Sequence, residues 1–165
     1  MKDELLDIVD QNDNVIGQKL RSEVYANKLS SFRVVNAFLI NKQGKLWIPR
    51  RTKDKRIFPL YLDASMGGHV MAGESYEQAL ARELMEELRI DILTEPYEYV
   101  GSLNPRKHST SAYMKVYLIR TDETPNYNTS DFIESFWFSP KELLNRIDLG
   151  DKSKDDLPLI VKNLF

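Results

Sequence analysis

The chain has 165 residues, of which 23 are basic and 25 acidic, giving a formal net charge of −2 at pH 7. This near balance excludes a protein whose overall field recruits nucleic acid or an anionic membrane, so any phosphate must be bound by local charge clusters. The absence of cysteine excludes disulfides, thiolate metal sites and cysteine nucleophiles. The length suits a single domain with a substantial core, spanning residues 1–165.

The N-terminal residues predict neither export nor a membrane anchor. They read MKDELLDIVDQNDN, which is too charged for a secretory signal, and no apolar run approaches the roughly 18 residues of a membrane span. We therefore expect a cytoplasmic protein without a membrane partner. Residues 5–9 and 15–20 are strand-like and flank the turn-rich QNDN, so they predict a β-hairpin.

The remaining elements alternate between strands and a few helices. Residues 32–41 predict a buried strand, and a turn at NKQGK leads to a second strand at 46–50. Strands interleaved with few helices favour an α/β fold, with helices packed on the faces of a mixed sheet. The later predictions are a helix starting after Ser75, strands at 97–103, 112–120 and 134–138, a helix at 140–146 and a closing helix at 155–165.

The helix after Ser75 carries the strongest chemical pattern. Residues three and four apart share a helix face, so Glu83, Glu86 and Glu87 fall on one face, while Gln78 completes a capping box with Ser75. Converging carboxylates repel one another, and a hard cation such as Mg²⁺ or Mn²⁺ removes that cost. For an isolated run of this kind, a solvated acidic helix face is the alternative. The apolar face expected opposite comprises Ala81, Leu84, Met85 and Leu88.

The sequence around this helix matches a longer motif. Gly68 is followed after five residues by Glu74 and, after seven more, by RELMEELRI, which begins at Arg82. This resembles the signature of the Nudix hydrolases, G-x5-E-x7-R-E-apolar-x-E-E-x-G-apolar, with one departure, because Arg89 replaces the last glycine. A left-handed residue other than glycine costs on the order of 1 kcal/mol, so the helix either accepts that strain or ends differently.

The flanking segments extend the resemblance over most of the chain. They read SFRVVNAFLINKQGKLWIPRRTKDKRIFP and DASMGGHVMAGES, and they are similar to the Nudix branch close to isopentenyl diphosphate isomerase, particularly to members that hydrolyse nucleoside di- and triphosphates. The resemblance implies a Nudix α/β/α sandwich with a mixed β-sheet. It also implies Mg²⁺- or Mn²⁺-dependent hydrolysis of a phosphoanhydride in a nucleoside di- or triphosphate, or in a related nucleoside diphosphate-linked compound.

The family motif assigns roles to residues of the helix and the preceding loop. Glu86 and Glu87 are expected to bind the metal, and Glu83 to act as a further ligand or as the base that orients water. The backbone carbonyl of Gly67 or Gly68 is another candidate ligand, because a side chain there would obstruct close approach.

Supporting roles fall to residues around these ligands. Arg82 is expected to orient the glutamates by ion pairing, and Glu74 to brace the loop or cap the helix. Family members often recruit one more acidic ligand or base from a later loop. Asp131 occupies a comparable place and is our candidate metal ligand, with Glu134 as its competitor and a solvated loop charge as the alternative for each.

A basic segment after the second long strand is the candidate phosphate site. By resemblance to the diphosphate-binding loop of the isomerase, Arg51 and Lys55 are the expected substrate-binding residues. His108 is a candidate proton shuttle, although a solvated loop histidine is more common, and the same holds for His69. Further candidates for phosphate binding are the cations Arg50, Lys53 and Arg56 and the loop NPRKHSTS at 104–111. The rings of Trp47, Phe58 and Tyr61 could stack on a base or pack in the core.

Two other functions remain to be weighed against hydrolysis. The isomerase pattern places a catalytic cysteine at the position of Gly67 and histidine ligands upstream, whereas this chain has no cysteine and only His69 and His108. A nucleotide-binding Nudix sensor is disfavoured by the intact glutamates and by the lack of room for a DNA-binding module. The sequence does not distinguish between substrates, because specificity lies in variable loops.

Overall fold

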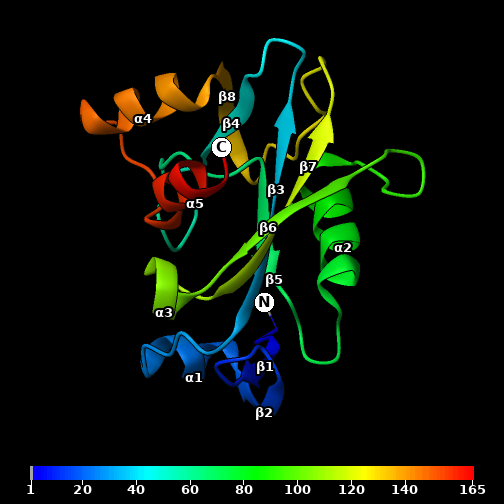
Figure 1. Cartoon of the computed structure of the whole chain (residues 1–165), viewed down its shortest axis with the longest axis vertical. Coiled ribbons are helices and arrows are strands. Elements are labelled where there is room, and N and C mark those ends of the chain that lie inside the picture. The colour runs from blue at the N-terminus through cyan, green and yellow to red at the C-terminus, as the bar shows by residue number, and fades with distance from the viewer. Residues whose placement is uncertain (1) are drawn as a thin grey trace.

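The structure is a computed structural model that describes residues 2–165 (Figure 1). Every element expected from the sequence is present, and none of the described helices is long and apolar enough to cross a bilayer. The elements are β1 (Leu5–Val9), β2 (Val15–Leu20), α1 (Arg21–Ala26), β3 (Arg33–Ile40), β4 (Leu46–Arg51), β5 (Met66–His69), α2 (Tyr76–Leu88), β6 (Glu98–Leu103), α3 (Pro105–His108), β7 (Tyr113–Arg120), β8 (Phe132–Phe138), α4 (Pro140–Asp148) and α5 (Asp156–Leu164).

The main sheet is mixed and has β3 at its centre. Its strand order is β6-β7-β3-β4-β8, and β3 runs parallel to β7 and antiparallel to β4. The pairing of β3 with β4 is recorded only at Ile40 and Leu46, and β5 takes the same edge of β3 further along. There, residues 34–37 pair with residues 66–69. The sheet therefore splits at one edge of β3, and the site described below lies at this split.

Helices cover both faces of the sheet. Leu80, Leu84 and Leu88 of α2 pack with Val35 and Leu39 of β3 in one apolar cluster. A second cluster, on the opposite face, joins β3 and β7 to α4 and α5 and contains Phe38, Val116, Leu143, Leu157 and Ile160. Because side chains alternate along a strand, β3 supplies both clusters. Figure 1 shows α2 on one side and α4 and α5 on the other, so the predicted α/β/α sandwich is confirmed.

The predicted N-terminal hairpin is also confirmed. β1 and β2 pair antiparallel from Leu5 and Leu20 onward and form a separate two-stranded sheet. A third apolar cluster, which includes Leu6, Val24 and Phe32, joins this hairpin and α1 to the start of β3. The hairpin is therefore packed against the main unit at the end of the sheet where β5 lies (Figure 1).

The termini of α2 show how local sequence sets this helix. The Ser75 side chain accepts a hydrogen bond from the backbone N–H of Gln78, and the Gln78 side chain accepts one from Ser75, which is the expected capping box. At the other end Arg89 has φ 55° and ψ 36°, so it adopts the left-handed conformation that the glycine would have taken. The alternative expectation of a different helix end is therefore wrong.

Several local expectations differ from the structure. β5 and α1 were not predicted, residues 105–108 of the expected loop form a helical turn, and β8 starts at Phe132, two residues early. Met85 is 47% exposed, so it does not belong to the buried face of α2. Glu83, on the contrary, is buried, because the helix turns this carboxylate towards β5. The acidic face of α2 is therefore partly enclosed and not simply solvated.

A charge network ties the C-terminal segment to the sheet. Asp151 accepts two hydrogen bonds from Arg50, at 2.9 and 3.1 Å, and one from Arg146 at 2.7 Å. These bonds, led by those from Arg50, hold the pKa of Asp151 at about 2, below its ordinary 3.8. A carboxyl group whose pKa is lowered on folding stabilises the protein above its unfolded pKa and stops doing so as the pH falls through the folded value.

We expect Asp151→Asn to lower the free energy of unfolding at pH 7 by about 1–2 kcal/mol, after allowance for partial solvent screening. The difference from the unsubstituted protein should shrink as the pH falls from about 4 towards 2, because both chains then lack this charge. Urea unfolding at several pH values measures it, with Asp148→Asn on the exposed end of α4 as the control. A difference that stays constant with pH would contradict the assignment.

Candidate active site

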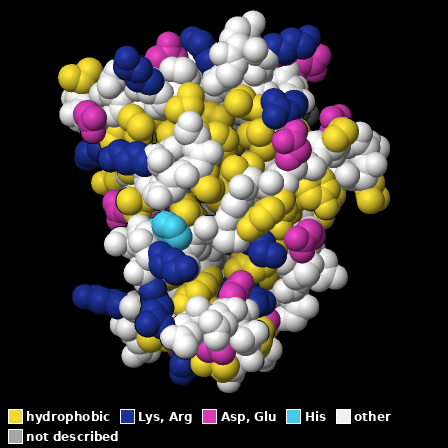
Figure 2. Space-filling model, in the orientation of Figure 1, with side chains coloured by type: hydrophobic (Ala, Val, Ile, Leu, Met, Phe, Trp, Pro, Cys, Tyr) yellow, Lys and Arg dark blue, Asp and Glu magenta, His cyan; other side chains and the backbone are white. Residues whose placement is uncertain are grey.

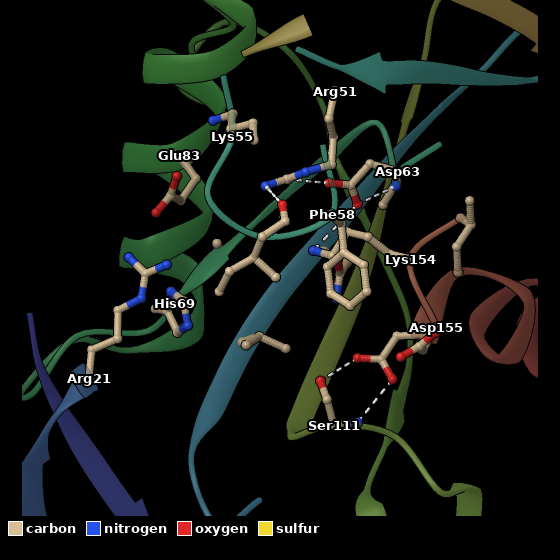
Figure 3. A pocket seen from close by; sticks show the side chains of 18 of the residues that line it. Arg21, Arg51, Lys55, Phe58, Asp63, His69, Glu83, Ser111, Lys154 and Asp155 are labelled. Carbon is tan, nitrogen blue, oxygen red and sulfur yellow. Dashed lines mark hydrogen bonds and ion pairs between the residues drawn. The ribbon is translucent and has the colours of Figure 1, made fainter. Parts of the chain in front are cut away.

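A cleft of 1020 Å³ opens between α2 and the split edge of the sheet. Figure 3 shows charged side chains from α2, from the loop after β4 and from the N-terminal side of α5 pointing towards one space. The residues preferred as metal ligands or phosphate-binding groups all line this cleft, whereas Arg82 does not. They are Gly67, Gly68, Glu83, Glu86, Glu87, Arg51, Lys55 and Asp131. The fold therefore gathers segments that lie up to 80 residues apart in the sequence (Arg51 and Asp131).

The glycine of β5 leaves room for a buried carboxylate. A Cβ atom at Gly68 would lie 2.2 Å from Cδ of Glu83, which is closer than real Cβ atoms approach other heavy atoms. At Gly67 a Cβ atom would lie 2.9 Å from Oδ1 of Asn36. Neither glycine has a positive φ, so both are required for space and not for backbone freedom. Gly68 and Glu83 thus fit together, and this contact links the first and central parts of the motif.

Arg82 connects the helix to the loop that precedes it. Its guanidinium donates to both carboxylate oxygens of Glu74, at 2.8 and 2.9 Å, and to Oε1 of Glu83 at 2.6 Å. It also donates to the backbone carbonyl of His69 at 2.9 Å. Glu74 in turn accepts the backbone N–H of Met71 at 2.9 Å. The hydrogen bonds that Arg82 donates to Glu74 and Glu83 raise its pKa, so this group stays charged and fixes the position of Glu83.

The three glutamates occupy very different environments. Burial raises the pKa of Glu83 to about 7 against the opposing effect of Arg82, and burial raises the pKa of Glu87 well above its ordinary value. Glu86 is 61% exposed at the mouth of the cleft. Oε2 of Glu87 is buried and has no hydrogen-bond partner among the described residues. A buried, unpartnered carboxylate oxygen is costly, and a bound cation removes that cost.

The two cations of the cleft that were expected from the sequence are paired with acids. Nη1 of Arg51 donates to Oδ2 of Asp63 at 2.8 Å, and Lys55 forms an ion pair with Asp131. In residues 2–165 no three acidic or histidine side chains form a ready metal cluster, and Glu83 and Asp131 instead contact Arg82 and Lys55. A divalent ion bound by Glu83 or Asp131 would have to displace Arg82 or Lys55, whereas Oε2 of Glu87 has no such partner among the described residues.

Comparison with known proteins agrees with the motif and the geometry. The profile of the NUDIX domain matches residues 31–158. An uncharacterized Nudix hydrolase of Nostoc is 56% identical over 162 residues, covering 98% of this chain and 96% of its own. A crystal structure from Deinococcus radiodurans superposes with a TM-score of 0.92 at 43% identity, covering 98% of this chain and 99% of the other.

The chain belongs to the Nudix hydrolase family. The predicted enzyme class, a pyrophosphohydrolase acting on acid anhydrides of phosphorus, is confirmed. An isopentenyl-diphosphate Delta-isomerase of Photorhabdus laumondii is 26% identical over 140 residues, covering 82% of this chain and 80% of its own. The expected closeness to the isomerase branch is therefore confirmed as well, although the cysteine that the isomerase pattern requires is absent.

Several residues considered from the sequence lie away from the cleft of this Nudix hydrolase. Arg50 donates to Glu134 and Asp151 and stacks over Phe136, so it serves the α4 side of the sheet. Its pairing also removes Glu134, the competitor of Asp131, from the site. Trp47 is fully buried and cannot stack on a substrate ring. The residues that do not line the cleft are Arg50, Lys53, Arg56, Tyr61, His108, Trp47 and Glu134.

The two histidines have structural surroundings. His69 is 14% exposed, lies 2.9 Å from the hydroxyl of Tyr25 and stacks on Phe32. Burial, followed by the charges of Arg21, Lys154 and Arg82, lowers its pKa to about 3, so it is neutral. The expectation of a solvated His69 is therefore wrong. Nδ1 of His108 accepts the backbone N–H of Asn104 at 3.0 Å, so that ring closes the turn of α3.

Asp131 and Glu134 provide a matched test of the later acidic ligand. We expect Asp131→Asn to lower metal-dependent kcat/KM by about 10- to 100-fold, because it removes a carboxylate from the cleft. Glu134→Gln, whose partner Arg50 lies outside the cleft, should change it by less than about threefold. Steady-state kinetics across a metal titration measures both, and an equal loss in the two variants would contradict the choice of Asp131.

Proposed function

We propose that this Nudix hydrolase cleaves, with Mg²⁺ or Mn²⁺, a phosphoanhydride bond in a nucleoside di- or triphosphate or a related nucleoside diphosphate-linked compound. The observation that carries the proposal is the buried Oε2 of Glu87, which has no hydrogen-bond partner within residues 2–165 and lies in the same cleft as Arg51 and Lys55. Carboxylates on one side of a cleft and an adjacent pair of basic groups suit a metal-bound phosphate chain.

The residues present fit a hard divalent ion. Glu86 and Glu87 would hold it, with Glu83, the carbonyl of Gly68 and Asp131 as further candidates. Such an ion neutralises charge on the phosphate chain and activates or positions water. The orphaned oxygen of Glu87 supports this fit, because a protein rarely buries a carboxylate oxygen without a partner.

The chain's own groups bind the phosphates and hold the acids. Lys55 is a mobile point charge, and its ammonium group can exchange its ion pair with Asp131 for one with a phosphate oxygen while staying in the cleft. Arg51 is less mobile, since Asp63 and the carbonyl of Ile57 fix its guanidinium. Arg82 binds Oε1 of Glu83 at 2.6 Å and keeps this carboxylate in place as a candidate metal ligand or water-orienting base.

We further propose that residues 1–165 act as one domain. The hairpin contacts the motif loop directly, because the N–H of Ala72 donates to the carbonyl of Leu5 at 2.8 Å. The N–H of Gly73 donates to the buried carboxylate of Asp7 at 3.0 Å. Since this loop leads to Glu74 and α2, the hairpin supports the same catalytic unit.

A substrate panel tests the proposal. Nucleoside di- and triphosphates, nucleotide sugars and dinucleotides are incubated with Mg²⁺ or Mn²⁺, and products and phosphate are measured. We expect metal-dependent turnover of at least one class. Tight binding without turnover across the panel would favour the sensor function. Isomerisation of isopentenyl diphosphate would overturn the inference drawn from the missing cysteine.

A further inference from the structure

A buried carboxylate holds two cations from distant parts of the chain at one wall of the cleft. Asp63 is 5% exposed, and its Oδ2 accepts from Nη1 of Arg51 at 2.8 Å. Its Oδ1 lies 3.6 Å from Nζ of Lys154, which is 91 residues further along the chain. Figure 3 shows the side chains of Arg51 and Lys154 converging on Asp63. Neither Asp63 nor Lys154 was singled out from the sequence.

Backbone contacts with Leu62 fix the position of the main chain at Lys154. Leu62 forms a parallel bridge with Ser153, its N–H donates to the carbonyl of Lys152 at 2.8 Å, and the N–H of Lys154 donates back to Leu62 at 2.9 Å. The segment is anchored again by Asp151, which pairs with Arg50. Asp63 and Lys154 are thus neighbours through a built contact between two segments, and not through the chance approach of two flexible side chains.

The ammonium group of Lys154 keeps donors for a ligand. A separation of 3.6 Å from Asp63 is an ion pair and not a hydrogen bond, so this contact does not use the three N–H donors of the group. The side chain is 30% exposed and lines the cleft. Arg51, by comparison, already donates to Asp63 and to the carbonyl of Ile57, and it is only 16% exposed. Lys154 is therefore the freer of the two cations.

We propose that Lys154 is a third phosphate-binding residue of this cleft, beside Arg51 and Lys55, and that Asp63 is the positioning residue for Lys154 and Arg51. The inference rests on the proposed phosphoanhydride substrate and adds a binding residue to it. The ligand it takes is the phosphate chain, at oxygens that face the wall opposite α2.

The charge balance of the cleft supports this assignment. A phosphate chain that approaches Glu83, Glu86 and Glu87 meets like charge, and a divalent ion offsets only part of it. Lys55 can leave Asp131 for a phosphate, but it lies on the loop after β4. Lys154, from the segment before α5, would hold the phosphate chain of the substrate from the opposite side of the cleft. Figure 2 adds that Lys and Arg side chains gather over α1 and α3 on the face shown, whereas acidic side chains there are scattered.

Binding of imidodiphosphate, a diphosphate analogue that resists hydrolysis, tests the proposal in the presence of Mg²⁺. Calorimetry on the full chain should show that Lys154→Met raises the dissociation constant by roughly 10- to 30-fold, the loss expected for one charge-assisted contact. Lys152→Met is the matched control. It removes the same charge two residues earlier in the sequence, and the side chain of Lys152 is exposed and does not line the cleft. It should change the constant by less than about twofold. Equal effects of the two variants would overturn the proposal.

The role of Asp63 is tested by a double-mutant cycle. Asp63→Asn should weaken imidodiphosphate binding through both cations, and Lys154→Met should then cost clearly less in the Asp63→Asn background than alone. A merely structural role of Asp63 predicts additive losses instead. Thermal unfolding of each variant checks that the chains are folded before binding is compared. Strictly additive losses in folded variants would remove Asp63 from the proposal.

Turnover separates this inference from the proposed function. If the unsubstituted protein hydrolyses a panel substrate and Lys154→Met leaves its KM unchanged, the proposed function stands and the role of Lys154 is rejected. If the unsubstituted protein hydrolyses no panel substrate but binds imidodiphosphate in a Lys154-dependent manner, the phosphate-binding role of Lys154 stands and the proposed reaction is rejected. Absence of imidodiphosphate binding by the unsubstituted protein would reject the phosphate-binding role of Lys154 and the positioning role of Asp63.

Discussion

Replacing Glu86 or Glu87 by Gln is expected to lower metal-dependent turnover by about a thousandfold or more. A bound cation contributes several kcal/mol to transition-state stabilisation, and each 1.36 kcal/mol corresponds to about tenfold in rate. Both carboxylates line the cleft, and the buried Oε2 of Glu87 has no partner in the described residues. Turnover of a panel substrate, measured across a range of Mg²⁺ concentrations, tests the expectation.

Stability measurements distinguish loss of the metal from loss of the fold. Glu87→Gln removes a buried acid whose pKa is raised, so the metal-free protein should unfold at the same or a higher temperature. Glu86 is 61% exposed, so its replacement should shift stability by less than about 0.5 kcal/mol. Glu77→Gln, on the same helix but outside the cleft, should retain activity. Retained turnover in both Glu86→Gln and Glu87→Gln would disprove the metal-site assignment.

The sequence predicted well those elements that carry a local signal. These signals are strand-like runs around a turn for the hairpin, a β-branched apolar run for β3 and a capping box for α2. β5 has the sequence MGGH and no such signal. It is a strand because β4 leaves the edge of β3 and residues 34–37 then pair with it. That edge exists only once the sheet has formed.

The residues of the candidate site could be chosen from the sequence where they lie in the contiguous motif. The spacing of Glu83, Glu86 and Glu87 is a local property of a helix, so it can be read from the sequence. Asp63 and Lys154 carry no local signal, because each needs the bridge between Leu62 and Ser153 to reach the cleft. Long-range pairing of this kind follows from topology.

Alternation along β4 could have sorted its two arginines. Adjacent residues of a strand point to opposite faces, so Arg50 and Arg51 cannot both face the cleft. The structure places Arg50 with Phe136 and Asp151 on the α4 side, and Arg51 with Asp63 in the cleft. Trp47, four residues before Arg51, shares its parity but lies in the core beneath α2. The alternation of side chains between the two faces of β4 could be predicted from the sequence, whereas the depth to which each side chain is buried could not.

Gly68→Ala is expected to reduce turnover by about a hundredfold, the typical loss when a catalytic group is displaced by about 1 Å. The added Cβ would lie 2.2 Å from Cδ and 2.3 Å from Oε1 of Glu83. Glu83 cannot move freely, because Arg82 binds its Oε1 at 2.6 Å and the side chain is only 12% exposed. The same crowding should destabilise the fold by about 1–3 kcal/mol. Gly17→Ala, with no atom within 4 Å of the new Cβ, is the control.

A second substitution shows whether Glu83 is the cause of the Gly68→Ala defect. Removing the Glu83 side chain also removes the clash, so Gly68→Ala should cost little stability when combined with Glu83→Ala. Turnover should stay low in the double variant, since the carboxylate is gone. Gly67→Ala, whose Cβ would lie 2.9 Å from Oδ1 of Asn36, should have a smaller effect than Gly68→Ala. If Gly68→Ala destabilised the protein equally with and without Glu83, the contact between β5 and α2 would not explain why glycine stands at this position.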